Sequence, residues 1–348
     1  MIEHNTCYAF LFDKIILLCY SYMDSGRSDV MDTKKVVLIG TGFVGMSMAY
    51  SFLNQGGIDE LVLIDVDKDK TVGEEMDLNH GLPYAPDKIK IRAGEYYDCK
   101  DADVVVITAG LAQKPGQSRL DLTIENAKIM KSITENVMDS GFNGIFVIAS
   151  NPVDTMSYVV YETSGLDKSK VIGSGTILDT ARLKQLLAEY FEVSSKSIHA
   201  YILGEHGDSS LVPWEHCYIG CKKLMEYAKE KGCSEEEIKA IHDAVWQAAY
   251  EIIAKKKATY YAIGMSLKRL VSAIVNDENS ILTVSAYQEN EYGQEGMYIG
   301  VPAVINKNGI KEIIKLHLNE EDQSKFNQSC EILKENIEEG IKPILRKK

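Results

Sequence analysis

Short, uninterrupted hydrophobic runs alternate with longer segments of helical periodicity in the first half of the chain. The runs lie at residues 35–40, 61–65, 102–110 and 144–149. They are short and apolar throughout, as strands buried on both faces are. The segments at 46–55 and 122–140 instead place apolar side chains three or four positions apart, as a helix with one buried face does. This alternation predicts an α/β fold with a Rossmann-type, doubly wound parallel sheet, which binds ligands at the carboxyl ends of its strands.

The pattern changes after residue 173, where helices become longer and strands stand next to one another. Helical spacing predicts helices over residues 177–191, from 234 to about 255, from 264 to about 275, and from 320 to about 345. Residues 198–203 form a strand or the end of one, and the runs at 281–287 and 298–306 predict an antiparallel meander. We therefore expect a first domain over residues 31–173 and a second, α+β domain with antiparallel strands and a C-terminal helix over 174–348.

Residues 1–30 follow neither pattern. The apolar run at 15–20 is too short to span a bilayer. Acidic Glu3 and Asp13 precede it, where a signal peptide would begin with basic residues. Met31, followed by polar residues, would make a natural start of the chain. We interpret residues 1–30 as an N-terminal extension that is either translated upstream sequence or a disordered arm.

Composition narrows the classes of function. The chain has 348 residues, of which 45% are hydrophobic and 26% charged, and this is typical of a globular protein with two cores. A formal charge of −13 argues against binding to nucleic acid or to an anionic membrane surface. The seven cysteines form no C-x-x-C pair, and Cys217 and Cys221 beside His216 lack a second pair of ligands. We expect no metal site, and reduced thiols in a cytoplasmic protein.

A glycine motif follows the first hydrophobic run directly. Gly40 permits a tight turn, Gly42 lets the backbone approach a pyrophosphate, and Gly45 lets the next helix close on the strand. The helix N-terminus offers unpaired N–H groups to phosphate. Asp65 ends the second strand twenty residues after Gly45, where its carboxylate can accept hydrogen bonds from both ribose hydroxyls and repel a 2′-phosphate. The motif predicts a binding site for NAD rather than NADP.

Polar side chains stand where a ligand of such a sheet would bind. Asn151 follows the run at 144–149, and a polar loop at 111–120, which contains Arg119, is placed to fold over the cofactor as a lid. His206 lies between two glycines, where an uncrowded ring can reach a ligand and change protonation near neutral pH.

Asp179 and Arg182 are three positions apart and project from one helix face. They form either a surface ion pair or a functional pair, in which Asp179 orients a histidine and Arg182 grips a carboxylate.

Taken together, these motifs resemble the L-lactate/malate dehydrogenase family, and most closely its bacterial L-lactate dehydrogenases. The resemblance extends from Lys34 to Leu345. The stretches that carry it are GTGFVG at 40–45, QKPGQSRLDL at 113–122, SNPVD at 150–154, GSGTILDTAR at 173–182, GEHGD at 204–208 and ATYYAI at 258–263. Their order along the chain is that of the family.

The resemblance implies reversible hydride transfer between NADH and pyruvate, giving L-lactate during fermentation, in a cytoplasmic homotetramer. His206 would donate and accept the proton, and Asp179 would stabilise its imidazolium. Arg119 would polarise the substrate carbonyl, and Arg182 would hold the substrate carboxylate. The remaining implied contacts are those of Asn151 with nicotinamide and substrate, of Val44, Ser174 and Ile263 with the cofactor, and of Thr259 with the substrate side chain.

Gln113 separates lactate from malate dehydrogenases in this resemblance. Malate enzymes carry arginine at this position, which pairs with the second carboxylate of oxaloacetate. A neutral Gln113 would leave that carboxylate buried and unpaired at a cost of about 3–5 kcal/mol, so we expect pyruvate to be preferred. Two alternatives stay open: a dehydrogenase for bulkier 2-keto acids, of the 2-hydroxyisocaproate type, and a non-catalytic NAD-binding sensor, against which the complete set of catalytic residues argues.

The sequence departs from the family at a regulatory site. Allosteric bacterial members bind fructose 1,6-bisphosphate at a subunit interface through an arginine and a histidine. The histidine position is His199, but Lys184 occupies the arginine position. Because lysine keeps the charge and loses the forked guanidinium geometry, activation by the sugar bisphosphate and its absence both remain open.

Overall fold

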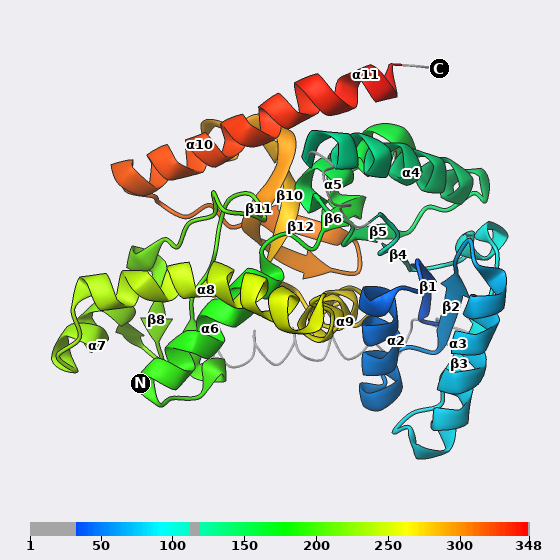
Figure 1. Ribbon diagram of the computed structural model, residues 1–348, viewed down its shortest axis with the longest axis horizontal. Helices are drawn as coiled ribbons and strands as arrows, with labels where there is room; N and C mark the ends of the chain where they lie inside the picture. The colour runs from blue at the N-terminus through cyan, green and yellow to red at the C-terminus, as the bar shows by residue number, and fades with distance from the viewer. Residues whose placement is uncertain (1–32, 112–118, 347–348) are drawn as a thin grey trace, which may run out of the picture. The chain divides into compact units, whose positions relative to one another are not determined.

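The hydrophobic runs of the first half form the centre of a nine-stranded sheet (Figure 1). The computed structural model describes residues 33–111 and 119–346. Its parallel strands are β1 (Lys35–Ile39), β2 (Glu60–Ile64), β3 (Lys90–Ala93), β4 (Val104–Ile107), β5 (Ile145–Ile148) and β6 (Val171–Gly173). They lie in the order β3-β2-β1-β4-β5-β6, so that the winding direction reverses between β1 and β4. This is the doubly wound order predicted, and it places the ligand crevice at the carboxyl ends of β1 and β4.

Three antiparallel strands extend the same sheet. They are β10 (Ser280–Glu289), β11 (Glu295–Asn306) and β12 (Gly309–Ile313). β10 joins the parallel part at Ser285, which faces Gly173 of β6. Glycine is required there, because a Cβ on Gly173 would lie 2.6 Å from the Cβ of Ser285. A separate three-stranded sheet contains β7 (Ile198–His199), β8 (Tyr218–Ile219) and β9 (Lys222–Lys223).

Helices cover both faces of the large sheet because its strands are apolar on both sides. Val37 and Ile39 of β1 pack into one core, and Val36 and Leu38 pack into the other. The first core is closed by α4 (Arg119–Asp139), α5 (Val153–Ser164) and α10 (Glu320–Asn336). The second core is closed by α2 (Phe43–Gln55), α3 (Lys68–Gly81) and α9 (Tyr261–Val275). Figure 1 shows α4, α5 and α10 above the sheet and α2 and α9 below it.

A third core lies outside the large sheet. It joins the small sheet to α6 (Ile177–Phe191), α7 (Leu224–Glu230) and α8 (Glu235–Lys256). The capping box predicted for α8 is present, with Ser234 Oγ accepting from the Glu237 N–H at 3.2 Å and Glu237 Oε2 from the Ser234 N–H at 2.7 Å. Within this core α8 packs against α6, which carries the Asp179 and Arg182 pair.

Several predicted element boundaries were wrong. The helix after the glycine motif begins at Phe43, because Gly42 already serves as its N-cap. The strand expected over residues 198–203 ends at His199, and Leu203 makes an isolated bridge to Leu211. The closing helix is interrupted by a π-helical turn, Ile337–Ile341, before α11 (Lys342–Leu345), where Pro343 lacks the N–H that a regular α-helix would use.

Some expectations are not decided by this architecture. The division into domains at residue 173 stays a prediction, since β10 continues the sheet of β6 across it. The N-terminal extension, residues 1–30, lies outside the described residues. Among the helices that the structure describes, none is both long and apolar enough to cross a membrane.

Candidate active site

The turn after β1 places the glycine motif beside Asp65. Gly40 has a φ of 103°, which favours glycine, and a Cβ on Gly45 would lie only 2.2 Å from the Gly40 carbonyl oxygen. The backbone N–H and hydroxyl of Thr41 donate to Asp65 Oδ2 at 2.7 and 3.1 Å. Burial opposes ionisation of Asp65, but these bonds and the charge of Lys70 lower its pKa. Asp65 is therefore a fixed, ionised acceptor.

The N-terminus of α2 is open for an anion. No side chain caps this helix, and a Cβ on its N-cap, Gly42, would meet no atom within 4 Å. N–H groups at such an end attract phosphate. An open helix end beside an ionised ribose acceptor fits a dinucleotide.

Two glycine substitutions separate cofactor binding from packing. We expect Gly42→Ala to leave thermal stability unchanged and to weaken NADH binding about tenfold, because its methyl group would point into the open space at the helix end. Gly45→Ala is expected to destabilise the protein by about 2 kcal/mol or more, since its methyl group collides with backbone. Thermal unfolding and NADH titration measure both effects. Unchanged NADH affinity in Gly42→Ala would contradict the placement of the pyrophosphate.

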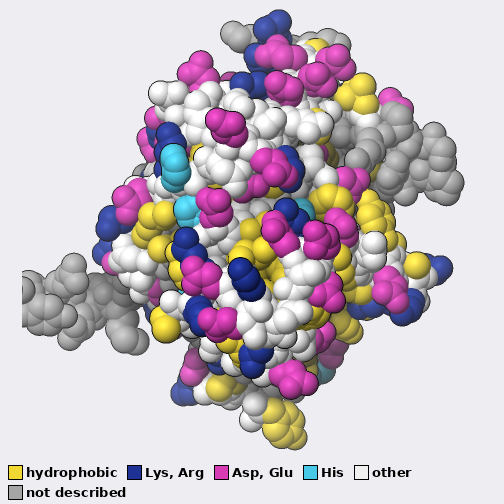
Figure 2. Space-filling model, turned by 90° about the vertical axis from the view of Figure 1, so that its left-hand side faces the viewer, with side chains coloured by type: hydrophobic (Ala, Val, Ile, Leu, Met, Phe, Trp, Pro, Cys, Tyr) yellow, Lys and Arg dark blue, Asp and Glu magenta, His cyan; other side chains and the backbone are white. Residues whose placement is uncertain are grey.

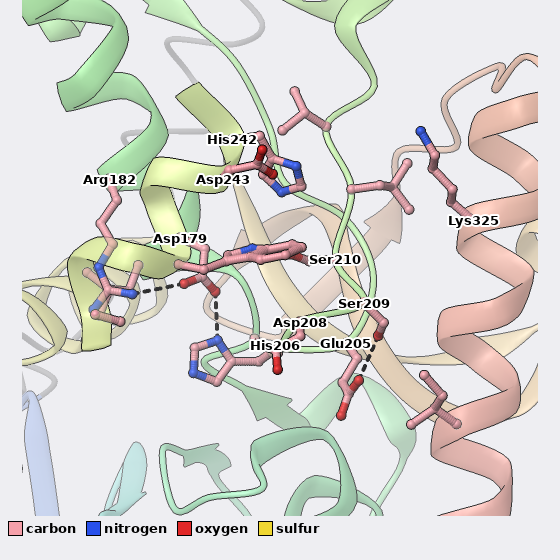
Figure 3. Close-up of a pocket in the computed structure, with 18 of the residues that line it drawn as sticks. Asp179, Arg182, Glu205, His206, Asp208, Ser209, Ser210, His242, Asp243 and Lys325 are labelled. Carbon is pink, nitrogen blue, oxygen red and sulfur yellow. Dashed lines mark hydrogen bonds and ion pairs between the residues drawn. The ribbon is translucent and has the colours of Figure 1, made fainter. Parts of the chain in front are cut away.

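The Asp179 carboxylate joins His206 and Arg182 (Figure 3). Its Oδ2 lies 2.6 Å from His206 Nδ1, and its Oδ1 accepts from the Arg182 guanidinium at 3.1 Å. Asp179 is in the first turn of α6 and only 7% exposed, whereas His206 stands in the loop after residue 203. Of the two interpretations of this helix pair, a surface ion pair was wrong, because both side chains are largely buried.

The charges of this cluster favour a protonated histidine. Burial disfavours the imidazolium, but the adjacent Asp179 carboxylate outweighs it and raises the pKa of His206. Burial likewise opposes ionisation of Asp179, and the charges of His206 and Arg182 lower its pKa. An ionised Asp179 thus holds a ring that can keep its proton near neutral pH and present Nε2 to a ligand.

One cavity of about 1560 Å³ brings together eight of the predicted site residues. Those that line it are Val44, Asn151, Ser174, Asp179, Arg182, His206, Thr259 and Ile263. They come from α2, α6 and α9, from the loops after β5 and β6 at the carboxyl edge of the sheet, from the loop that carries His206, and from the segment between α8 and α9 that carries Thr259. The lining of the cavity combines apolar side chains such as Val44 and Ile263 with the hydrogen-bonding groups of His206 and Arg182.

Of the other predicted residues, Gly40, Gly42, Gly45 and Asp65 belong to the glycine-motif region described above, and four fall elsewhere. Gln113 and the lid loop at 112–118 lie outside the described residues, and Arg119 begins α4 but its side chain is also outside them. His199 is an exposed residue of β7, and Lys184 is a half-buried residue of α6 whose pKa is lowered by burial. Neither of these two lines the cavity.

The structure adds contacts that the sequence did not indicate. Asp154, in the quoted SNPVD stretch, accepts from the backbone N–H of His206 at 2.9 Å. On α8, Trp246 Nε1 donates to Ser210 Oγ at 3.3 Å and the Tyr250 hydroxyl donates to Asp208 at 3.1 Å. α5 and α8 therefore hold the histidine loop from the sides. Sequence spacing contained no signal for these contacts, since their partners are far apart in the chain.

Within residues 33–111 and 119–346, no group of three His, Cys, Asp or Glu side chains could hold a metal ion. The described cysteines are all free thiols. On the face shown in Figure 2, acidic and basic side chains are interspersed.

Two models of one protein family together match most of the chain. The NAD-binding domain model of lactate/malate dehydrogenases matches residues 34–173, and the α/β C-terminal domain model of the same family matches residues 176–343. An L-lactate dehydrogenase 2 of Lactococcus lactis subsp. lactis is 55% identical over 307 residues, covering 88% of this chain and 98% of that protein. An L-lactate dehydrogenase 2 of Bacillus anthracis is 54% identical over 304 residues, covering 87% and 97%.

Solved structures give the same result. A lactate dehydrogenase enzyme from a Medee basin deep-sea metagenome library has a TM-score of 0.87 and 52% identity, covering 88% of this chain and 99% of that one. The minor L-lactate dehydrogenase of Enterococcus mundtii, in a ligand-bound form, also has a TM-score of 0.87, with 48% identity and coverage of 88% and 98%.

Proposed function

The chain belongs to the lactate/malate dehydrogenase family, and from this premise we propose how its cavity interconverts pyruvate and L-lactate. The reaction is a reversible, NAD-dependent oxidation of an L-2-hydroxy acid. The observation that carries the assignment of roles is the 2.6 Å contact between His206 and Asp179 inside the cavity. Bound NADH supplies the hydride, and the side chains of the chain supply the proton, the orientation and the charge.

His206 is the proton donor and acceptor of this proposal. In the direction of reduction, its protonated Nε2 gives a proton to the ketone oxygen of pyruvate, and in the reverse direction it takes the proton from lactate. Asp179 fixes the ring through Nδ1 and compensates the positive charge. Arg182 has one N–H on Asp179, and we assign the other N–H groups of its planar fork to the substrate carboxylate.

We assign cofactor binding to residues at the open N-terminus of α2 and on the wall of the cavity. Gly40, Gly42 and Gly45 shape the pyrophosphate site, and Asp65 accepts from the ribose. Val44, Ser174 and Ile263 line the part of the cavity assigned to the nicotinamide, with Asn151 between cofactor and substrate and Thr259 in the substrate pocket. Arg119, assigned from its motif, polarises the carbonyl.

An assay of NADH oxidation with pyruvate, oxaloacetate and branched 2-keto acids tests this function. We expect pyruvate to give the highest kcat/KM. A branched substrate that exceeds pyruvate would favour the 2-hydroxyisocaproate type of enzyme. No oxidation with any of these acids would reject the enzymatic function and leave a non-catalytic NAD-binding sensor.

Replacing Gln113 with arginine is expected to shift preference toward oxaloacetate. The added guanidinium would pair with the second carboxylate, whose burial without a partner costs about 3–5 kcal/mol, so the ratio of kcat/KM for oxaloacetate over pyruvate should rise by at least about 100-fold. Gln117→Arg, in the same loop, is the matched control for added charge. An unchanged ratio in Gln113→Arg, or an equal rise in the control, would contradict the assignment.

We also propose a cytoplasmic homotetramer, supported by the family and by the free thiols, with a sugar-bisphosphate site at His199 and Lys184. Burial lowers the pKa of Lys184, and lysine lacks the guanidinium fork. We therefore expect fructose 1,6-bisphosphate to lower the KM for pyruvate less than threefold, which corresponds to a coupling free energy below about 1 kcal/mol. Pyruvate saturation curves with and without the bisphosphate measure this. A large decrease in KM would show that lysine suffices.

Sedimentation of the full chain tests the tetramer.

A further inference from the structure

Three consecutive backbone N–H groups fix the loop that carries His206. The N–H of Gly204 donates to the Gly300 carbonyl of β11 at 3.0 Å. The N–H of Glu205 donates to Ser329 Oγ of α10 at 2.7 Å, and that of His206 donates to Asp154 Oδ2 of α5 at 2.9 Å. The three acceptors are a carbonyl, a hydroxyl and a carboxylate. Asp154 therefore differs from the other two, because it can bring a charge to the histidine as well as hold its backbone.

Asp154 is built into the interior as part of this loop's support. It is only 2% exposed, and its second oxygen, Oδ1, accepts from the hydroxyl of Ser285, which is fully buried on β10. It lies in the first turn of α5, where the helix dipole favours a negative charge. Both carboxylate oxygens thus have a partner, as an ionised buried carboxylate requires.

The titration of Asp154 falls close to neutral pH. Burial raises its pKa to about 6, against the opposing effects of the Ser285 hydroxyl, the His206 N–H and the charge of His206. A carboxyl with this pKa carries most of its charge at neutral pH and loses it on moderate acidification.

The other charged groups around this pair are few and come from defined elements. From α6, Asp179 favours the imidazolium of His206 and Arg182 opposes it. In the loop itself, Glu205 disfavours ionisation of Asp154. From α10, the Cys330 thiol faces Asp154, and burial raises its pKa to about 12, so it stays neutral. Among these groups, Asp154 acts on His206 in the same direction as Asp179.

We propose that Asp154 is a second positioning carboxylate for His206: one oxygen holds the backbone of the histidine loop, and its negative charge, with that of Asp179, favours the protonated ring. This inference deepens the proposed function and rests on it. Asp154 touches neither substrate nor cofactor in this role. It acts through the position and the charge of His206.

Asp154→Asn and Asp154→Ala separate charge from position. The asparagine oxygen can still accept from the His206 N–H, so the loop stays in place while the charge is lost. We expect the alkaline limb of the pH profile of kcat/KM for pyruvate to move to lower pH, because the imidazolium loses support and gives up its proton earlier. In Asp154→Ala the backbone anchor is lost as well, and we expect kcat to fall by about tenfold or more relative to the asparagine variant.

Ser329→Ala is the matched control, since it removes the neighbouring backbone anchor without changing any charge. Its alkaline limb should stay at the wild-type pH even where kcat decreases. A limb that moves as far in Ser329→Ala as in Asp154→Asn would overturn the electrostatic role. A limb that stays at the wild-type pH in a folded, active Asp154→Asn would overturn the proposal.

Ser285→Ala provides the test if Asp154→Asn does not fold. The Ser285 hydroxyl lowers the pKa of Asp154, so without it this pKa rises and part of the negative charge is lost near neutral pH. A smaller shift of the alkaline limb in the same direction is expected, and an unshifted limb would overturn the proposal. A wild-type protein without activity on any 2-keto acid would instead reject the proposed function, and this inference with it.

Discussion

Replacement of His206 by asparagine is expected to lower kcat/KM for pyruvate by about 10³- to 10⁴-fold, the contribution of a well-placed general acid. Asparagine has a similar size but cannot carry the proton to the ketone oxygen or the positive charge that Asp179 compensates. NADH binding should be unchanged, because the glycine motif and Asp65 lie on other elements of the sheet. Initial rates of NADH oxidation and an NADH titration of the same preparation measure the two effects.

His216→Asn is the control for this experiment. His216 belongs to the neighbouring segment, and its Nε2 lies 2.7 Å from the backbone carbonyl of His317 rather than in the cavity. Its activity should therefore remain near that of the wild type. Activity within about tenfold of wild type in His206→Asn would mean that another group donates the proton, and the proposed mechanism would fail.

Replacement of Asp179 by asparagine is expected to lower kcat/KM for pyruvate at neutral pH by about 10³-fold and to change its pH dependence. Loss of the buried carboxylate removes both the fixed orientation of His206 and the charge that raises its pKa. The ring then loses its proton at lower pH. Since reduction of pyruvate needs the protonated ring, its alkaline limb should move to lower pH. Oxidation of lactate, which needs the neutral ring, should lose less activity above that limb.

The measurement is a pair of pH profiles, one for each direction of the reaction. Asp167→Asn is a suitable control, because Asp167 is an exposed helix cap whose carboxylate accepts from the Ser169 N–H at 2.9 Å. Its profiles should coincide with those of the wild type. If the alkaline limb of Asp179→Asn stayed in place, the charge of Asp179 would have no part in the protonation of His206.

Much of the fold could be predicted from periodicity, and the failures have local causes. β1, β4 and β5 are continuous apolar runs and were recognised. α5 was missed because its first eight residues are all buried, so it presents no alternation of polar and apolar faces. α3 was missed for the opposite reason, since it buries only Thr71 and Leu78.

The candidate site divides in the same way between local and long-range information. The glycine motif acts within one strand–turn–helix unit, and its conformation follows from residues that are close in sequence. The adjacency of Asp179 and Arg182 likewise follows from helical spacing. Asp154 supports the histidine loop from a position 52 residues away from His206, and Ser329 supports it from a position 124 residues away from Glu205. No periodic pattern along the chain predicts such pairings.

By itself, the sequence predicted most of the strands and helices and the open turn for a dinucleotide, and its resemblance to the family predicted which residues could act as acid, carboxylate grip and ribose acceptor. These depend on side-chain chemistry and on spacing along one element. Only the tertiary structure decided that Asp179 Oδ2 lies 2.6 Å from His206 Nδ1 and that Asp154 accepts a hydrogen bond from the backbone N–H of the same histidine. The packing of α5, α6 and β10 around the end of the sheet sets these distances, and packing depends on contacts through space between elements that are remote in the chain.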